Sequence, residues 1–264
     1  MPLRLRAFTR RTHYYHKLEL EPKVFRRSHA ALTKALQGGR QLTRDELRDA
    51  LTRADVVTHG LQRMAYIMMS AEIDGIVCSG ARRGKQFTYA LLDERVPKAT
   101  ALKRDEALAE LVKRYFLSHG PATLQDFVKW SGLTMSDARN GLEEVKGQFD
   151  AALVDGHTYW FAALTPFRKV KSPMVYLLPN YDEYTIGYRN HSAVFDTSHL
   201  NQLVFSHLLV VTGRIAGTWK RTLNKTSVVI QSNSFTRLTK AETRAIAVAA
   251  GQYGVFLKLP VVLA

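Results

Sequence analysis

Two helical patterns open the regular part of the chain. Thr43 followed by Glu46 three residues later is typical of a capping box, and Leu47 and Leu51 then recur at helical spacing. A second amphipathic pattern covers residues 61–71, where apolar side chains repeat on one face. The pattern therefore predicts two consecutive helices after residue 42.

A β-hairpin is predicted directly after these helices. Its strands are expected at 76–79 and 86–92, because apolar and polar residues alternate in the second of them. Glycines bound the tip at 80–84, which carries Arg82 and Arg83. Helices followed by a basic hairpin are typical of a winged helix, a variant of the helix-turn-helix.

The same order recurs downstream. A helical pattern over 108–116 ends before Gly120, Thr123 caps the next predicted helix, and a third pattern covers 134–145. A hairpin then turns at Asp155-Gly156, a strong two-residue turn signal. The offset of roughly 80 residues predicts an internal repeat of two winged helices.

The last third of the chain reads as a small β-domain. Strand-like runs are expected at 174–178, 183–188, 207–212, 214–219 and 227–231. Thr239 and Glu242 form a second capping box, followed by an amphipathic helix. The expected fold class is α+β, with tandem winged-helix (helix-turn-helix) domains followed by a small C-terminal β-barrel-like domain.

Four segments follow from this pattern. The expected boundaries are a basic N-terminal arm or helix at 1–40, winged helix 1 at 41–97, winged helix 2 at 101–165, and a C-terminal β-domain with a terminal helix at 170–264. The opening residues contain no acidic side chain before Glu19, which fits either an Arg-rich transit peptide or a basic arm. An aromatic-rich, serine-poor composition favours the arm.

Composition and charge narrow the function classes. With 46% hydrophobic residues, the 264-residue chain can bury a substantial core, so it is neither disordered nor collagenous. Its 38 basic and 23 acidic residues give a net charge of +15, which favours a polyanionic partner such as nucleic acid or anionic lipid. Together with the two predicted winged helices, this makes double-stranded DNA the predicted partner. A single cysteine, Cys78, excludes an intrachain disulfide and favours a cytoplasmic, nucleoid-associated protein. The apolar stretch 245–257 is too short to span a membrane.

The sequence gives weaker evidence for catalytic or metal-binding residues than for a polyanionic partner. Asp182 and Glu183 are the obvious carboxylates for an acid-base pair, but neighbours on a strand face opposite sides, and a turn role for Asp182 is favoured. The triplet 190–192 reads as a loop rather than a nucleophile with its base. His13 and His16 lack nearby carboxylates for zinc. We therefore predict no catalytic residue, no metal, no cofactor and a monomer.

Candidate DNA contacts come from the hairpins, the helices and the arm. Arg82, Arg83 and Lys85 at the first tip are favoured for phosphate or minor-groove contact, with a solvated turn as the alternative. The aromatic run 159–161 fits either a wedge into DNA or core packing. The full set is Arg82, Arg83, Lys85, Arg63, Arg139, Asn140, His157, Tyr159, Arg10 and Arg11.

Four segments resemble a known family. They are LTRDEL at 42–47, GLQRMAYIMMSAEIDGIV at 60–77, LLPNYDEYTIGYRNHS at 177–192 and GRIAGTW at 213–219. Together they are similar to the winged-helix DNA-binding family that includes the AlkZ-type DNA glycosylases. This resemblance implies tandem winged helices, a C-terminal β-barrel, a concave DNA-binding body and, in glycosylase members, metal-free removal of alkylated or cross-linked bases.

One departure from the family pattern distinguishes DNA binding alone from glycosylase activity. Glycosylase members carry a Gln-x-Gln or Gln-x-Asp motif in an N-terminal winged helix, whereas Gln37, Gln41 and Gln62 are isolated here. The chain is therefore expected to begin after that domain. The leading prediction is binding of duplex DNA, including duplexes with alkylated or damaged sites. The alternatives are an AlkZ-type glycosylase for alkylated or cross-linked purines, and a transcriptional regulator.

Overall fold

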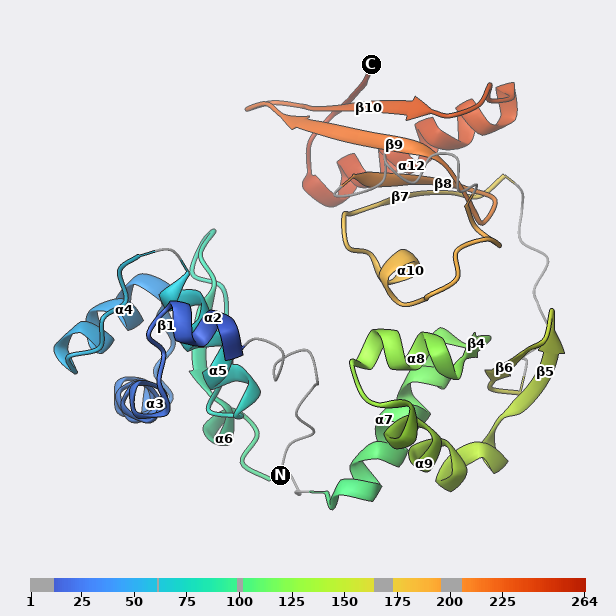
Figure 1. The fold of residues 1–264 in the computed structure, drawn as a ribbon. Helices are drawn as coiled ribbons and strands as arrows, with labels where there is room; N and C mark the ends of the chain where they lie inside the picture. Colours follow the sequence, from blue (N-terminus) through green and yellow to red (C-terminus); the bar gives the residue numbers. More distant parts are fainter. Residues whose placement is uncertain (1–11, 61, 99–101, 164–172, 196–205) are drawn as a thin grey trace. The chain divides into compact units, whose positions relative to one another are not determined.

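The computed structural model has a mixed α/β fold (Figure 1). The chain divides into two compact units. Unit 1 comprises 1–111 and 132–141, and unit 2 comprises 112–131 and 142–264. The structure describes residues 12–60, 62–98, 102–163, 173–195 and 206–264.

Most of unit 1 is helical around a small antiparallel sheet. Its elements are α2 (Thr12–Lys17), α3 (Pro22–Leu36), β1 (Leu42–Thr43), α4 (Arg44–Arg53), α5 (Arg63–Ile73), β2 (Val77–Ser79), β3 (Thr88–Leu91) and α6 (Leu92–Arg95). The sheet order is β1-β3-β2. The predicted helices and hairpin are confirmed.

Local capping and apolar spacing explain these helices. The Thr43 side chain accepts a hydrogen bond from the backbone N–H of Glu46, and the Glu46 carboxylate accepts the N–H of Thr43, as the capping box predicts. Met64 and Met68 are buried in α5, so its methionine face belongs to the core. The segment 1–40, expected to form an arm or helix, also contributes to this core, because Leu32 of α3 is fully buried in it.

The second repeat runs through both units. Its elements are α7 (Arg104–His119), β4 (Ala122–Thr123), α8 (Leu124–Ser131), α9 (Met135–Val145), the 3₁₀ turn Lys146–Gln148, β5 (Asp150–Val154) and β6 (His157–Phe161). Asp155 and Gly156 both have positive φ, which a two-residue hairpin turn requires. The predicted hairpin is confirmed, and the sheet order is β4-β6-β5.

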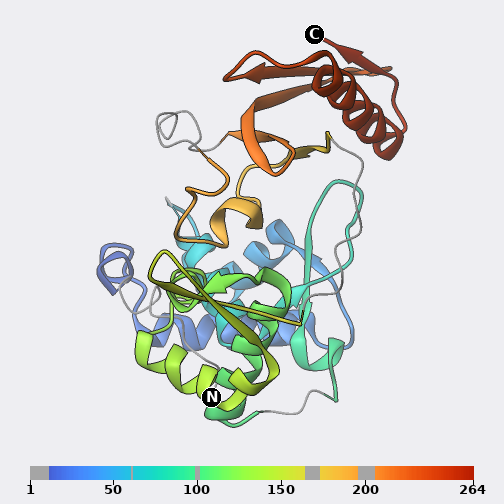
Figure 2. The same cartoon turned by 90° about the vertical axis from the view of Figure 1, so that its right-hand side faces the viewer.

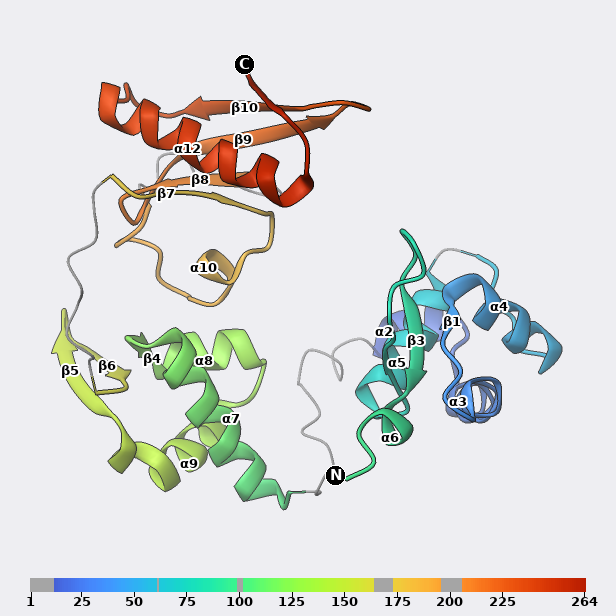
Figure 3. The same ribbon diagram turned by 180° about the vertical axis from the view of Figure 1, so that it is seen from behind.

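The remaining part of unit 2 is a half-barrel sheet with one covering helix. The elements are β7 (Val175–Leu178), α10 (Glu183–Ile186), β8 (His207–Val211), β9 (Arg214–Leu223), β10 (Val228–Ser234), α12 (Lys240–Leu257) and β11 (Val261–Leu263), with sheet order β11-β10-β9-β8-β7. All pairings are antiparallel except β10 with β11. Figure 3 shows α12 across one face, where Ile246 packs with Leu209 and Val211.

One sequence expectation is wrong. The run 183–188 was expected to form a strand, but it begins with the short helix α10. The Asp182 side chain accepts a hydrogen bond from the N–H of Tyr184 at 2.9 Å and so caps this helix. The aspartate side chain therefore favours a helical turn where apolar alternation alone indicates a strand. The predicted turn role of Asp182 is confirmed.

Both repeats share one order of elements. The order helix, strand, helix, helix, strand, strand describes α3-β1-α4-α5-β2-β3 and also α7-β4-α8-α9-β5-β6. In each three-stranded sheet the third strand lies between the first and the second. The short strands β1 and β4 were not predicted, because two residues carry no alternation.

Candidate nucleic-acid interface

The β2–β3 loop places three of the predicted DNA-contact residues close together. Arg82, Arg83 and Lys85 are all solvent-exposed, and the neighbouring Phe87 has 65% of its surface exposed. The Arg82 guanidinium carbon lies 4.4 Å from the centre of the Phe87 ring. Three cations and an aromatic ring thus share one exposed loop. The backbone of this loop, drawn in turquoise, can be followed in Figure 2.

Arg83 has a different environment from Arg82. Its guanidinium donates to the Glu46 carboxylate at 2.8 Å and to the backbone carbonyl of Gln41 at 2.7 Å. The Thr43 backbone N–H, the Arg83 guanidinium and the Thr43 hydroxyl lower the pKa of Glu46 to about 2. Arg83 therefore connects the loop to the start of α4, and its contact with DNA stays a prediction.

Further hydrogen bonds hold the base of this loop. The Ala81 N–H donates to the Gln41 side-chain oxygen at 2.6 Å, and the Thr88 hydroxyl donates to the Ala81 carbonyl at 2.5 Å. A Cβ atom on Gly80 would lie 2.8 Å from the same Gln41 oxygen. Since little space remains at this position, glycine permits the close approach.

The predicted helical contacts differ in their availability. Arg63, at the start of α5, is half-buried and donates to the carbonyls of Val57 and Leu18. Arg139 and Asn140 are exposed on α9. Arg63 therefore connects the loop before α5 to the segment that follows α2, whereas Arg139 and Asn140 of α9 face solvent. Arg10 and Arg11 lie outside the described residues.

The β5–β6 hairpin has a different chemical character. His157 is exposed beside the turn and Tyr159 is half-buried, as are the next two aromatic residues of β6. Between Asp150 and Phe161 the sequence contains no Lys or Arg. This hairpin lacks the positive charge of the β2–β3 loop, so the contacts predicted for His157 and Tyr159 stay predictions.

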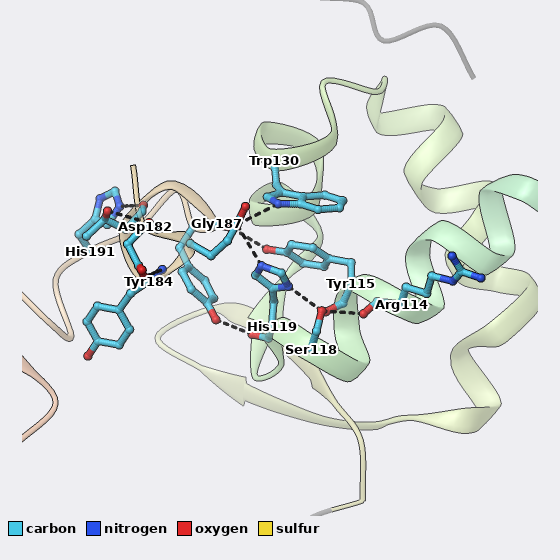
Figure 4. A network of polar contacts seen from close by, with 12 residues as sticks. Arg114, Tyr115, Ser118, His119, Trp130, Asp182, Tyr184, Gly187 and His191 are labelled. Carbon is cyan, nitrogen blue, oxygen red and sulfur yellow. Dashed lines mark hydrogen bonds and ion pairs between the residues drawn. The ribbon is translucent and has the colours of Figure 1, made fainter. Parts of the chain in front are cut away.

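A polar network in unit 2 surrounds Glu183 (Figure 4). One carboxylate oxygen of Glu183 accepts the indole N–H of Trp130 at 3.0 Å and lies 3.1 Å from the His119 Nε2 atom. The His119 ring stacks on Tyr115 with 4.6 Å between ring centres. Glu183 is therefore held by aromatic residues of α7 and α8.

Further bonds fix the segment that follows Glu183 to the same helices. The buried Tyr115 hydroxyl donates to the Gly187 carbonyl at 2.8 Å, and the Tyr188 hydroxyl donates to the His119 carbonyl at 2.9 Å. Burial raises the pKa of both Tyr115 and Tyr188. Because both hydroxyls keep their protons, they remain hydrogen-bond donors at neutral pH.

The two adjacent carboxylates, Asp182 and Glu183, have different hydrogen-bond partners. Asp182 caps α10, while Glu183 contacts the ring nitrogens of Trp130 and His119. The two carboxylates therefore bind separate partners. The predicted loop at 190–192 is confirmed, because these residues belong to no helix or strand. The His191 side chain contacts the Thr185 carbonyl. Within the ranges that the structure describes, there is no group of three metal-ligating side chains and no helix that could cross a membrane.

Two features of these sites were missed from the sequence. Phe87 was assigned only to strand alternation, although its ring is exposed beside Arg82. The partners of Glu183 are 53 and 64 residues away along the chain, and no local spacing indicates them. An apolar residue next to a predicted basic tip is the only sequence signal that could have drawn attention to Phe87.

Repeated helical units with an exposed basic loop are typical of proteins that bind nucleic acids. The family described as DNA glycosylase AlkZ-like matches residues 2–256. The chain therefore belongs to the AlkZ-like DNA glycosylase family. This confirms the AlkZ part of the resemblance noted from the sequence, while the winged-helix part stays a prediction.

Two comparisons show how far the similarity extends. The interstrand DNA cross-link repair glycosylase of Streptomyces sahachiroi is 26% identical over 202 residues, which cover 64% of this chain and 53% of that protein. The chain thus spans about half the length of this curated relative. The solved structure of S. sahachiroi DNA glycosylase AlkZ matches with a TM-score of 0.71 and 18% identity, covering 96% of this chain and 72% of that one. This likeness shows a shared fold.

Proposed function

We propose that this protein binds double-stranded DNA through two winged-helix repeats. The observation that carries the proposal is the repeated order of three helices and three short strands, with the same strand order in both sheets. In a winged helix the third helix enters the major groove and the hairpin contacts the backbone. Arg139 and Asn140 are exposed on the third helix of the second repeat, where groove contacts are made.

Charge at the β2–β3 loop supports the same proposal. Arg82 and Lys85 are exposed at its tip, and the chain has a net charge of +15. Each phosphate that a cation neutralises releases a counterion, which makes affinity depend on salt. The loop is therefore a phosphate-binding wing in this proposal.

A salt series tests DNA binding. We expect the logarithm of duplex affinity to fall linearly with the logarithm of salt concentration. The double variant Arg82→Ala/Lys85→Ala should weaken binding on all sequences alike and reduce the slope by up to about two. Lys103→Ala/Lys146→Ala, which removes two exposed charges elsewhere, is the matched control. A flat salt response, or no binding at low salt, would contradict the proposal.

A second candidate function is removal of alkylated or cross-linked purines from DNA. Family membership over residues 2–256 favours it, and one relative carries the name of an interstrand cross-link repair glycosylase. Incubating the protein with a duplex that contains an N7-alkylated purine should then produce abasic sites. The duplex without the lesion is the control, and an unchanged alkylated duplex would count against this activity for the chain.

A further inference from the structure

We propose that Phe87 and Arg82 form a stacking site for an unpaired or extruded nucleobase. The inference rests on the proposed binding of DNA and assigns a base, rather than only phosphates, to the β2–β3 loop. Phe87 is the most exposed large hydrophobic side chain among the described residues of unit 1. An aromatic ring in this position offers a flat apolar surface to a ligand from solvent.

The position of Arg82 shapes the site. Its guanidinium lies over the Phe87 ring, with 4.4 Å from the guanidinium carbon to the ring centre. A cation–π contact of this kind restricts the ring and makes it one layer of a stack. A nucleobase can extend such a stack because its own faces are aromatic, and a guanidinium plane also stacks on bases.

The loop is organised before any ligand binds. Arg83 is paired with Glu46, the Ala81 N–H is bonded to Gln41, and the Thr88 hydroxyl is bonded to the Ala81 carbonyl. Arg83 and Gln86 also exchange backbone hydrogen bonds of 3.0 and 3.1 Å across the tip. Binding therefore requires little further ordering of the chain, which lowers its entropic cost.

The expected ligand is an unpaired base with its attached phosphate. A base inside an intact duplex has both faces covered by its neighbours, so it offers no surface to Phe87. A bulged or extruded base does offer one, and base–aromatic stacking is tolerant of sequence. Lys85 is exposed two residues before Phe87, which is a suitable place to contact the adjoining phosphate.

Two duplex probes that differ only in one unpaired base test this site. One probe carries a single bulged 2-aminopurine, and the other is the same sequence fully paired. Affinities of the intact chain and of the Phe87→Ala, Phe87→Leu and Phe87→Trp variants are measured for both probes. Phe256→Ala is the matched control, because Phe256 is 79% exposed in α12. Thermal unfolding of each variant checks that the fold is unchanged.

Stacking predicts a specific pattern of results. Phe87→Ala should weaken binding of the bulged probe roughly tenfold, while binding of the paired probe changes by less than about twofold. Phe87→Leu should behave like Phe87→Ala because it keeps apolar area without a π face, and Phe87→Trp should restore affinity. The 2-aminopurine fluorescence should decrease on binding to the intact chain but not to Phe87→Ala.

Other patterns overturn the proposal. Equal effects of Phe87→Ala on both probes, no effect on either, or full affinity in Phe87→Leu would each show that no base stacks on this ring. These outcomes differ from failure of DNA binding itself, in which the unmodified protein would bind neither probe at low salt. The stacking site and the proposed function are therefore tested separately.

Discussion

Adjacent arginines at the tip of the β2–β3 loop have different roles. Arg83 is paired with Glu46 and with the Gln41 carbonyl, whereas Arg82 lies over the exposed Phe87 ring. Both residues are equally basic in the sequence, and only their partners distinguish them. A cluster of basic residues in the sequence therefore does not reveal the partner of each residue in it.

The Thr43 cap gives a prediction about stability. Replacing Thr43 with Ala removes the acceptor for the Glu46 N–H at the start of α4. We expect Thr43→Ala to lower the free energy of unfolding by about 1 kcal/mol, measured by urea denaturation. Thr52→Ala, on the exposed part of the same helix, should change it by less than about 0.5 kcal/mol. Equal effects of both substitutions would contradict the capping role.

His29 gives a prediction about pH. Burial lowers the pKa of His29 below its ordinary value of 6.5, and the opposing effect of Asp74 is smaller. The unfolded chain therefore binds a proton more readily than the folded chain, so stability is present above about pH 6.5 and is lost as pH falls from that value through the folded pKa. Urea midpoints between pH 7.5 and 5 should decrease less for His29→Gln than for the unmodified protein. An identical pH dependence would exclude His29 as the cause.

At the scale of elements, capping and turn residues explain most of the structure. The boxes at Thr43 and Thr239 begin α4 and α12, and Asp155-Gly156 forms the turn between β5 and β6. Each of these signals consists of residues within four positions of one another, so each can be recognised from the local sequence. The helix α10 was not predicted, because the apolar pattern of this segment also fits a strand. Only the cap formed by Asp182 indicates a helix there.

Two residues of α12 test how this helix is held on the sheet. Ile246 is buried against Leu209 and Val211, while Val248 on the same helix is 62% exposed. We expect Ile246→Ala to destabilise the protein by about 2–5 kcal/mol, because it leaves a cavity in the core. Val248→Ala should cost less than about 0.5 kcal/mol. Denaturant unfolding compares them, and similar losses would argue against the packing of Ile246.

At the scale of the whole chain, charge is unevenly distributed. Residues 1–40 contain ten Lys or Arg and two Glu, and residues 193–264 contain eight basic and two acidic residues. The middle part, 41–192, is nearly neutral with 20 basic and 19 acidic residues. Because long-range attraction to DNA follows net charge, the two ends should supply much of the affinity, and the β2–β3 loop a local contact.

This distribution predicts where a loss of charge matters most. Lys220 and Lys225 are exposed on β9 and in the turn that follows it. We expect Lys220→Ala/Lys225→Ala to weaken duplex binding and to reduce its salt slope by up to about two. Lys103→Ala/Lys146→Ala in the nearly neutral middle should reduce the slope less. Filter binding over a salt series provides the comparison, and equal slopes for the two double variants would refute it.

Features that depend on neighbouring residues can be read from the amino-acid sequence alone. Capping boxes and the Asp-Gly turn can be recognised within short windows, and the repeated pattern and the excess of positive charge follow from the order and number of residues along the chain. Tertiary structure alone decided that Arg83 pairs with Glu46, 37 residues away, and that Glu183 binds Trp130, 53 residues away. It also decided that Phe87 stays exposed. The physical reason is that burial and side-chain pairing depend on which distant segments meet, and local periodicity carries no information about those partners.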